Sequence, residues 1–324
     1  MTKRTLWLVV PWAIFAALAI GWTIYWFALA NATEQRLRAR NDLSVERIVR
    51  HGFPVLLRVE LQNAAYAQRG WRLETERVNL HVNPLNPNHV TLQARAPIAF
   101  ARADGHVTNI SADALIATMR TRRGAIAVAG VEGDNIALDD PAEDGVMRIE
   151  KVVLNLRPDP RAAGEYQMAF EARALTLPRP VRSFEAFGQD VAQMRAAVVI
   201  EQAAALLQPN QGNPLGAWRE AGGRMRFEAL ALNWGPLETT GEGVGGLDEE
   251  RRLAGELRLP IEEPAPVLRA LADGPSVESD TRRAINQIAT VLSFTGDDIT
   301  LDVEAENGAL SIEGLRIRAL PPVY

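Results

Sequence analysis

Cysteine is absent from this sequence, which excludes disulfide bonds, thiolate catalysis and metal or cluster sites built on cysteine. Histidine is scarce as well, with 4 in 324 residues, and aromatic side chains make up only 6% of the chain. Basic residues are outnumbered by acidic ones, 35 to 40, giving a net charge of −5. Because phosphate binding needs clustered Lys and Arg, this balance argues against a nucleic-acid partner.

Familiar catalytic motifs are also missing: there is no G-x-S-x-G, no P-loop and no H-E-x-x-H. The one formal match is a G-x-G-x-x-G pattern from Gly241 to Gly246. A dinucleotide site needs this pattern between a strand and a helix, whereas residues 247–259 lead into another strand. Glu242 would also repel a phosphate. We therefore predict a glycine-rich hairpin loop here and no cofactor.

Three small polar groupings remain as possible metal or acid–base sites. His81 and His89 flank a predicted hairpin, where a metal pair is possible but two surface imidazoles fit better. The acidic stretch 139–144 has oxygen ligands suited to calcium but lacks the EF-hand spacing, which favours a solvated turn. Asp297 and Asp298 are adjacent, so on a strand they point to opposite faces and do not converge. We assign no catalytic and no metal-binding residue.

The strongest local signal is an uncharged run from Leu6 to Ala30. A membrane-spanning helix needs roughly 20 apolar residues, so this run predicts a transmembrane anchor over residues 1–30. Aromatic residues stand towards both ends of the run, as in the belts at membrane interfaces. The predicted interface residues are Trp7, Trp12, Trp22, Tyr25 and Trp26.

Cleavage and orientation of this segment are open alternatives. Ala28-Leu29-Ala30 fits a signal-peptidase site, but the apolar run is longer than a signal core of about 7–15 residues, which favours an uncleaved anchor. Lys3 and Arg4 precede the run, and three arginines lie within residues 36–40, so charge alone does not decide the orientation. The layout of a short tail, one span and a long domain favours export of the large part.

After the anchor, residues 31–51 carry a weak apolar stripe and are predicted to form a helical stalk ending at Gly52 and Pro54. Residues 52–324 then show repeated period-2 alternation, typical of antiparallel strands with one dry and one wet face. The alternating segments are 78–82, 90–96, 152–156, 166–170, 227–231, 253–259, 299–303, 310–312 and 315–317. Turn residues such as Asn83-Pro84 and Asn307-Gly308 separate them.

Helical spacing interrupts the strands in three places, at 183–208, 264–271 and 277–294. Segregated strands and helices indicate an α+β fold: a transmembrane helix followed by a mostly antiparallel, curved β-sheet domain with a few amphipathic helices. The β-rich domain 52–324 divides naturally into two halves, 52–180 and 183–324.

Particular segments resemble a known family. The stretch from Gly52-Phe53-Pro54 through Trp71-Arg72-Leu73-Glu74 to His89-Val90, and the ending Leu310 to Tyr324, are similar to the alphaproteobacterial membrane-anchored proteins called DUF2125. The stretch 226–237, with Gly241 and Gly243, resembles a strand–turn–strand unit of the AsmA-like superfamily. These resemblances imply an inner-membrane anchor, a periplasmic β-rich body and a place near lipid-transfer or envelope-assembly proteins. They carry over no catalytic residue.

The leading hypothesis is a non-enzymatic protein of the bacterial inner membrane, with most of the chain in the periplasm, that binds phospholipid in an apolar groove of its sheet. A long apolar sheet face needs a cover, which is either protein or lipid. A scaffold that binds another envelope protein by strand addition is the alternative, and a hydrolase of envelope polymers has only scattered acids in its favour. The predicted groove residues are Val78, Leu80, Val82, Val90, Leu92, Phe227, Leu230, Leu232, Leu257 and Leu259.

Overall fold

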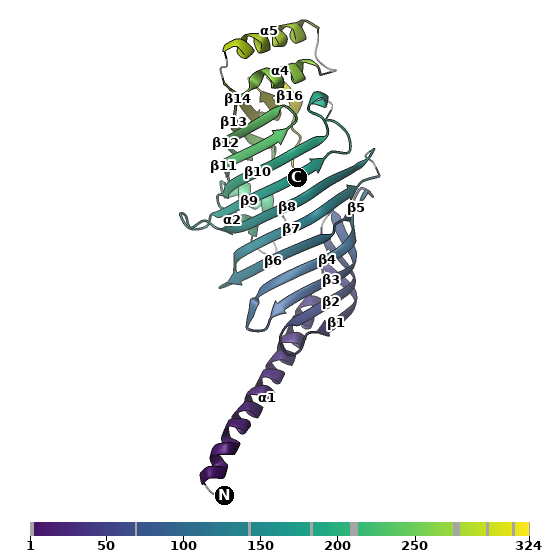
Figure 1. Cartoon of the computed structure of the whole chain (residues 1–324), viewed down its shortest axis with the longest axis vertical. Helices are drawn as coiled ribbons and strands as arrows, with labels where there is room; N and C mark the ends of the chain where they lie inside the picture. Colours follow the sequence, from purple (N-terminus) through teal and green to yellow (C-terminus); the bar gives the residue numbers. More distant parts are fainter. Residues whose placement is uncertain are drawn as a thin grey trace. The chain divides into compact units, whose positions relative to one another are not determined.

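The computed structural model describes residues 3–68, 70–141, 144–181, 184–207, 213–274, 279–295, 298–312 and 315–323. Side chains are described in these ranges except at 3–11, 96, 281, 312 and 315–318. The chain divides into two units, Met1–Ala125 and Ile126–Tyr324, each organised around an antiparallel sheet (Figure 1). The α+β prediction with mostly antiparallel strands is confirmed. The expected break at 180–183 falls instead between two paired strands of the second unit.

The first unit begins with a long helix and continues with six strands. Its elements are α1 (Lys3–Arg38), β1 (Leu43–His51), β2 (Leu57–Gln68), β3 (Trp71–Asn83), β4 (Asn86–Arg102), β5 (Val107–Ser111) and β6 (Ala114–Arg122). Strands β1 to β4 pair in chain order, and the long β4 then pairs with β5 along its second half and with β6 along its first. The predicted turn at Asn83-Pro84 joins β3 to β4.

The second unit is a meander of strands with short helical insertions. Its elements are β7 (Ala125–Asp139), β8 (Val146–Pro158), β9 (Tyr166–Thr176), η1 (Glu185–Phe187), β10 (Asp190–Ile200), α2 (Ala203–Leu207), α3 (Pro214–Glu220), β11 (Met225–Trp234), β12 (Leu237–Leu247), β13 (Leu253–Ile261), α4 (Pro264–Ala272), α5 (Ser279–Thr295), β14 (Ile299–Glu306), β15 (Ala309–Ile312) and β16 (Leu315–Ala319). Each strand from β7 to β16 pairs with the next one in the chain.

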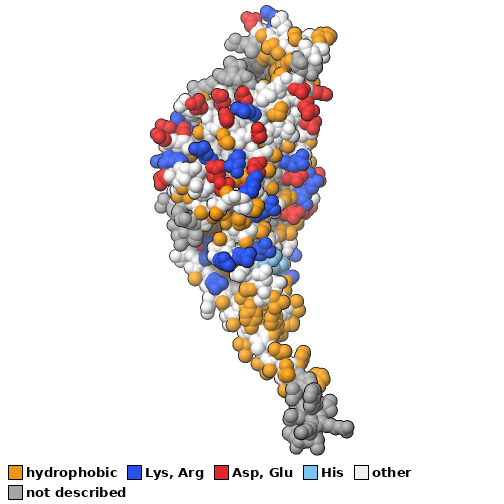
Figure 2. Space-filling model, turned by 90° about the vertical axis from the view of Figure 1, so that its left-hand side faces the viewer, with side chains coloured by type: hydrophobic (Ala, Val, Ile, Leu, Met, Phe, Trp, Pro, Cys, Tyr) orange, Lys and Arg blue, Asp and Glu red, His pale blue; other side chains and the backbone are white. Residues whose placement is uncertain are grey.

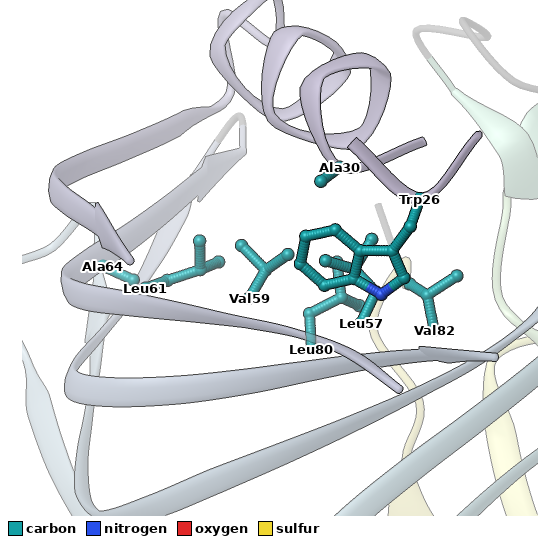
Figure 3. Close-up of a cluster of buried hydrophobic side chains, with 8 residues drawn as sticks. All are labelled: Trp26, Ala30, Leu57, Val59, Leu61, Ala64, Leu80 and Val82. Atoms are coloured by element: carbon teal, nitrogen blue, oxygen red, sulfur yellow. The ribbon is translucent and has the colours of Figure 1, made fainter. Parts of the chain in front are cut away.

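The helix α1 has two distinct parts. Before Trp22 its described side chains are exposed, with Trp12 at 72% and Leu18 at 68%. After Trp22 the helix lies on the sheet, where Trp26 (3% exposed) and Ala30 (0%) join a core with residues of β2 and β3. The sheet side of that core consists of Leu57, Val59, Leu61, Ala64, Leu80 and Val82 (Figure 3).

Two polar contacts fix the helix to the ends of the strands. The Trp22 indole N–H donates to the carbonyl oxygen of Pro54 at 2.8 Å, and the Tyr25 hydroxyl donates to that of Pro84 at 2.6 Å. Pro54 precedes β2, and Pro84 lies in the β3–β4 turn. Because each polar tip is satisfied by protein, these two side chains and Trp26 serve to dock the helix. Trp26, predicted as a membrane-interface side chain, is 3% exposed, so its ring packs against protein and does not face lipid.

Two predicted helices are corrected. Residues 31–51 are helical only to Arg38, and from Leu43 they form β1, whose carbonyl and amide groups pair with β2. Residues 190–200, predicted as part of a helix over 183–208, form β10, which pairs with β9 and β11. In both cases a few apolar residues at helical spacing were outweighed by the backbone pairing that a neighbouring strand offers.

Candidate lipid-binding face

Strand register gathers the apolar side chains of the second unit on one face of its sheet. Because directly paired residues point to the same side, one cross-strand row runs through Leu154, Phe170, Ala196 and Leu230. Glycines of β12 follow on this face, with Gly241 paired to Leu230 and Gly243 to Phe227. Beyond them, the face continues on β13 and β14 with the pairs Leu257–Val303, Leu259–Leu301 and Ile261–Ile299. The alternation seen in the sequence thus becomes one apolar surface across seven strands.

The opposite face is polar and charged. The cross-strand row adjacent to that of Leu154 and Leu230 points to this opposite face and consists of Val153, Glu171, Arg195 and Ala231. On β13 and β14 the pair Arg258–Asp302 lies on the same face. Two shallow depressions lie on this side, with volumes of about 440 and 430 Å³. The first is lined by charged side chains, and the second has a floor of alanines from β9 to β11. The sheet of the second unit is therefore amphipathic.

A helical insertion covers one end of the apolar face. Trp218 of α3 is 1% exposed and packs with Val198, Ile200 and Tyr166, at the end of the strands where β10 stops. Its indole N–H donates to the carbonyl oxygen of Glu201 at 2.7 Å, which satisfies the buried donor. The helix α3 starts cleanly because Asn213 caps it, accepting from the Gly216 amide at 2.9 Å.

A second insertion covers the other end. Phe187 of η1 and Val267 of α4 pack with Ile261, where β13 stops and β14 begins. Phe184 and Trp234 add an aromatic cluster, with ring centroids of Phe187 and Trp234 5.2 Å apart. Between the two covered ends, Leu154, Phe170 and Leu230 are only half-buried. The middle of the apolar face is thus its open part.

Glycines on β12 allow close approach of the neighbouring strand in this middle region. A Cβ at Gly243 would lie 2.2 Å from the Glu256 carbonyl oxygen, and one at Gly241 would lie 2.4 Å from that of Arg258. Glycine inside a strand commonly marks such a tight bend or close approach. The pattern Gly241–Gly246 is therefore neither a nucleotide loop nor the predicted hairpin loop, because it forms the interior of β12.

The predicted groove residues separate into two groups. Val78, Leu80, Val82 and Val90 belong to the core beneath α1, so the prediction that they line an open groove is wrong. Leu92 pairs with Leu80 but is 40% exposed. Phe227, Leu230, Leu232, Leu257 and Leu259 lie on the apolar face of the second unit, with Phe227 packed against the cluster around Trp218. Of the predicted groove residues, this second set shares the partly exposed apolar face of the second unit.

The positions of the histidines and acidic residues bear on the metal-site alternatives. No set of three or more His, Asp or Glu side chains is placed to hold a metal within the described part of the chain. His81 pairs with Thr91, and His89 pairs with Arg120, so the two histidines are not register partners. Glu143 of the acidic stretch and Asp297 lie outside the described residues.

One charged cluster was not anticipated from the sequence. Arg161 binds Asp159 through both carboxylate oxygens and reaches Glu228 at 2.7 Å, joining the β8–β9 loop to β11. These hydrogen bonds from Arg161 hold the pKa of Asp159 well below the ordinary value of 3.8. The close spacing of Asp159 and Arg161 in the sequence could have indicated their ion pair. The contact of Arg161 with Glu228 arises only from the fold.

Taken together, these features define a β-sheet protein with a long apolar helix docked on one antiparallel sheet and with a partly exposed apolar face on a second, amphipathic one. In α1 the described stretch Trp12–Arg38 is long and apolar enough to cross a membrane, criteria that a secretory signal also meets. The chain belongs to the DUF2125 family, described as an uncharacterized protein conserved in bacteria, whose sequence model matches residues 26–321. The predicted resemblance to DUF2125 is thereby confirmed, whereas the resemblance of residues 226–237 to the AsmA-like superfamily stays a prediction. No curated protein matches the chain, and no solved structure does.

Proposed function

We propose that this chain is a single-pass protein of the bacterial inner membrane, with its two sheet units in the periplasm, that binds the acyl chains of a phospholipid on the open apolar face of the second unit. The observation that carries the proposal is the continuous apolar row Leu154, Phe170, Ala196 and Leu230, which is covered by helices at both strand ends and half-open between them.

The dimensions of this face suit an acyl chain. Strands lie about 4.8 Å apart, so the seven strands from β8 to β14 offer roughly 29 Å of apolar surface across the sheet. The acyl chains of one leaflet extend about 15 Å, half of the hydrocarbon core. Burying apolar chain on this surface is favourable by about 25 cal/mol per Å² and needs no polar partner. Such a role requires no catalysis.

Photocrosslinking in the full chain tests the proposal directly. We would place a photoreactive phenylalanine analogue at position 230 or 259 on the apolar face and irradiate cells or native membranes. The matched control is position 231, which neighbours position 230 but points to the polar face. We expect a phospholipid adduct by mass spectrometry at 230 and 259 and none at 231. Equal labelling at 230 and 231, or no lipid adduct at either apolar position, contradicts the proposal.

A charge substitution gives the complementary result. Leu230→Glu places a carboxylate in the middle of the apolar face, where it would have to be desolvated against an acyl chain. We expect loss of the lipid adduct at position 259 in this variant. Ala231→Glu, on the polar face, should leave that adduct unchanged.

A scaffold that binds another envelope protein is the second candidate. The observation in its favour is an exposed apolar stripe on α5, where Ile288, Val291 and Phe294 are 55%, 59% and 86% exposed. This role predicts that Phe294→Ser abolishes a stoichiometric protein partner in pull-downs with the full chain. It also predicts that the lipid adduct at position 230, if present, does not depend on Phe294.

A further inference from the structure

Where α1 leaves the sheet of the first unit, it is flanked by two short loops. Pro54 and Pro84 in these loops accept hydrogen bonds from Trp22 and Tyr25. Phe53 also packs against the helix, with its ring centroid 5.5 Å from that of Trp26 and 5.8 Å from that of Phe27. The loops 52–56 and 83–86 are therefore held beside the helix at the level of residues 22–27.

Both loops leave apolar side chains exposed to solvent. Leu85, at the tip of the β3–β4 turn, is 81% exposed, Val55 is 78% exposed and Phe53 is 48% exposed. Turns in contact with water usually carry polar residues, and a group of exposed apolar side chains marks a contact surface. Because these three residues stand around an apolar helix, they extend its apolar surface sideways.

Basic residues follow directly behind the apolar tips. The segments 49–58, 80–92 and 116–124 meet at this end of the strands, since His51 pairs with Arg58, Arg58 with His81, and His89 with Arg120. None of these segments contains an Asp or Glu, although the whole chain carries a net charge of −5. Their basic residues are Arg50, His51, Arg58, His81, His89, Arg120, Arg122 and Arg123.

Figure 2 shows the resulting order of side chains: a band of hydrophobic groups beside the helix and, farther from its tip, a row of Lys and Arg side chains with a histidine. An apolar band followed by a basic row matches the profile of a bilayer, in which the acyl boundary gives way to anionic headgroups. A protein partner with an acidic rim would explain the basic row but not the apolar band beside the helix.

The length of the free part of α1 leaves no gap between bilayer and loops. Charged Lys3 and Arg4 bound the apolar run on one side, and docking on the sheet begins at Trp22 on the other. About 17 residues from Leu6 to Trp22 span roughly 26 Å at 1.5 Å per residue, whereas the hydrocarbon core is about 30 Å thick. If the helix crosses the membrane, the loops must reach its surface.

We infer that this edge of the first unit rests on the bilayer entered by α1, with Phe53, Val55 and Leu85 in the interface and the arginines facing anionic lipid headgroups. The inference rests on α1 crossing the membrane but is independent of lipid binding by the second unit. It assigns the first unit a defined orientation towards the lipid surface.

Because the chain has no cysteine, single labels can be placed without background. We would attach a polarity-sensitive fluorophore to Leu85→Cys and, separately, to Asp104→Cys in the full chain. Asp104 is an exposed control in the β4–β5 turn, at the other end of β4. Both proteins would be reconstituted in phosphatidylcholine vesicles, with and without phosphatidylglycerol, that contain nitroxide-labelled lipid.

We expect strong loss of fluorescence at position 85 and no loss at position 104. The loss at 85 should decrease in vesicles without phosphatidylglycerol and in the Arg58→Glu, Arg120→Glu double variant. An equal loss of fluorescence at positions 85 and 104 overturns the inference. Quenching at 85 that is insensitive both to phosphatidylglycerol and to the double variant overturns the assignment of the arginines. Neither result bears on crosslinking at position 230, so the two proposals fail separately.

Discussion

At the scale of single residues, Asp159 is the best-defined electrostatic feature. It is 6% exposed, and the Arg161 guanidinium and backbone amide both hydrogen-bond to its carboxylate. The pKa of Asp159 is therefore lowered in the folded state. A carboxyl group with a lowered pKa adds stability that is complete above its unfolded value and is lost as pH falls through the folded value.

We predict that Asp159→Asn lowers the urea midpoint by a constant amount above about pH 5 and that the difference from the parent protein shrinks only below the ordinary value of 3.8. Urea unfolding followed at several pH values checks this. A difference that disappears already at pH 6 would show that Asp159 does not act through its charge. Asp302→Asn is a suitable control because the Asp302 carboxylate is more than half exposed and 4.0 Å from Arg258.

Trp26 gives a second prediction at this scale. Replacing a buried Trp by Ala usually costs about 3–5 kcal/mol, because apolar contact is lost and a cavity remains. We expect Trp26→Ala to reduce the unfolding free energy of the first unit by an amount in this range, measured by pulse proteolysis of the full chain in nanodiscs. Trp12→Ala, at a 72% exposed position on the same helix, should leave stability unchanged.

At the scale of elements, sequence reasoning succeeded for several strands and helices that have one buried and one wet face, although it assigned β1 to a helical stalk. The turns at Asn83-Pro84 and Asn307-Gly308 and the helices near 264–271 and 277–294 were predicted correctly, and they appear as α4 and α5. It failed at β10 because Val198 and Val199 are both buried, at 2% and 0% exposed. When consecutive residues of a strand are both apolar and buried, the alternation of period two is not visible in the sequence. The spacing of Phe184, Phe187 and Val191 then resembled that of a helix.

The candidate site was predictable only in part for the same reason. Leu257 could be assigned to an apolar strand face from alternation alone. Alternation over 227–231 instead separates Leu230 from Phe227, and a register shift between these two residues places them on the same face. Whether such a face is covered depends on contacts distant in sequence, and alternation carries no information about them. Thus Leu80 and Leu230 look equivalent in the sequence, yet α1 covers Leu80 and leaves it 7% exposed.

The close approach at β12 leads to a prediction about that element. In Gly243→Ala the new methyl group would meet the Glu256 carbonyl oxygen at 2.2 Å, so the backbones of β12 and β13 must separate. We expect a clearly lower thermal midpoint for this variant. Gly246→Ala is the matched control on the same strand, because its nearest atom, the Gly223 carbonyl oxygen, is 3.5 Å away. Equal midpoints for the two variants would refute a steric role for Gly243.

At the scale of the whole molecule, the two sheet units differ in how the apolar face of each sheet is covered. In the first unit a helix from the same chain covers the apolar surface of β2 and β3. In the second unit helical insertions cover only the strand ends. The units should therefore respond differently to loss of the N-terminal segment, which supplies cover to one of them alone.

We predict that a chain lacking residues 1–30 loses amide-exchange protection in β2 and β3 and binds a hydrophobic dye, while β8 to β11 keep their protection. Hydrogen exchange with mass spectrometry, compared with the full chain, gives the measurement. Unchanged protection in β2 and β3 would mean that Trp26 and Ala30 are dispensable for the first unit.

The docking of α1 also bears on how the protein could be processed. The sequence Ala28-Leu29-Ala30 has the small-x-small pattern of a signal-peptidase site, but Ala30 is 0% exposed and Trp26 lies just before it in the core. A protease cutting there would remove part of a folded domain along with the leader. We therefore expect cleavage after Ala30 and a native first unit to exclude each other.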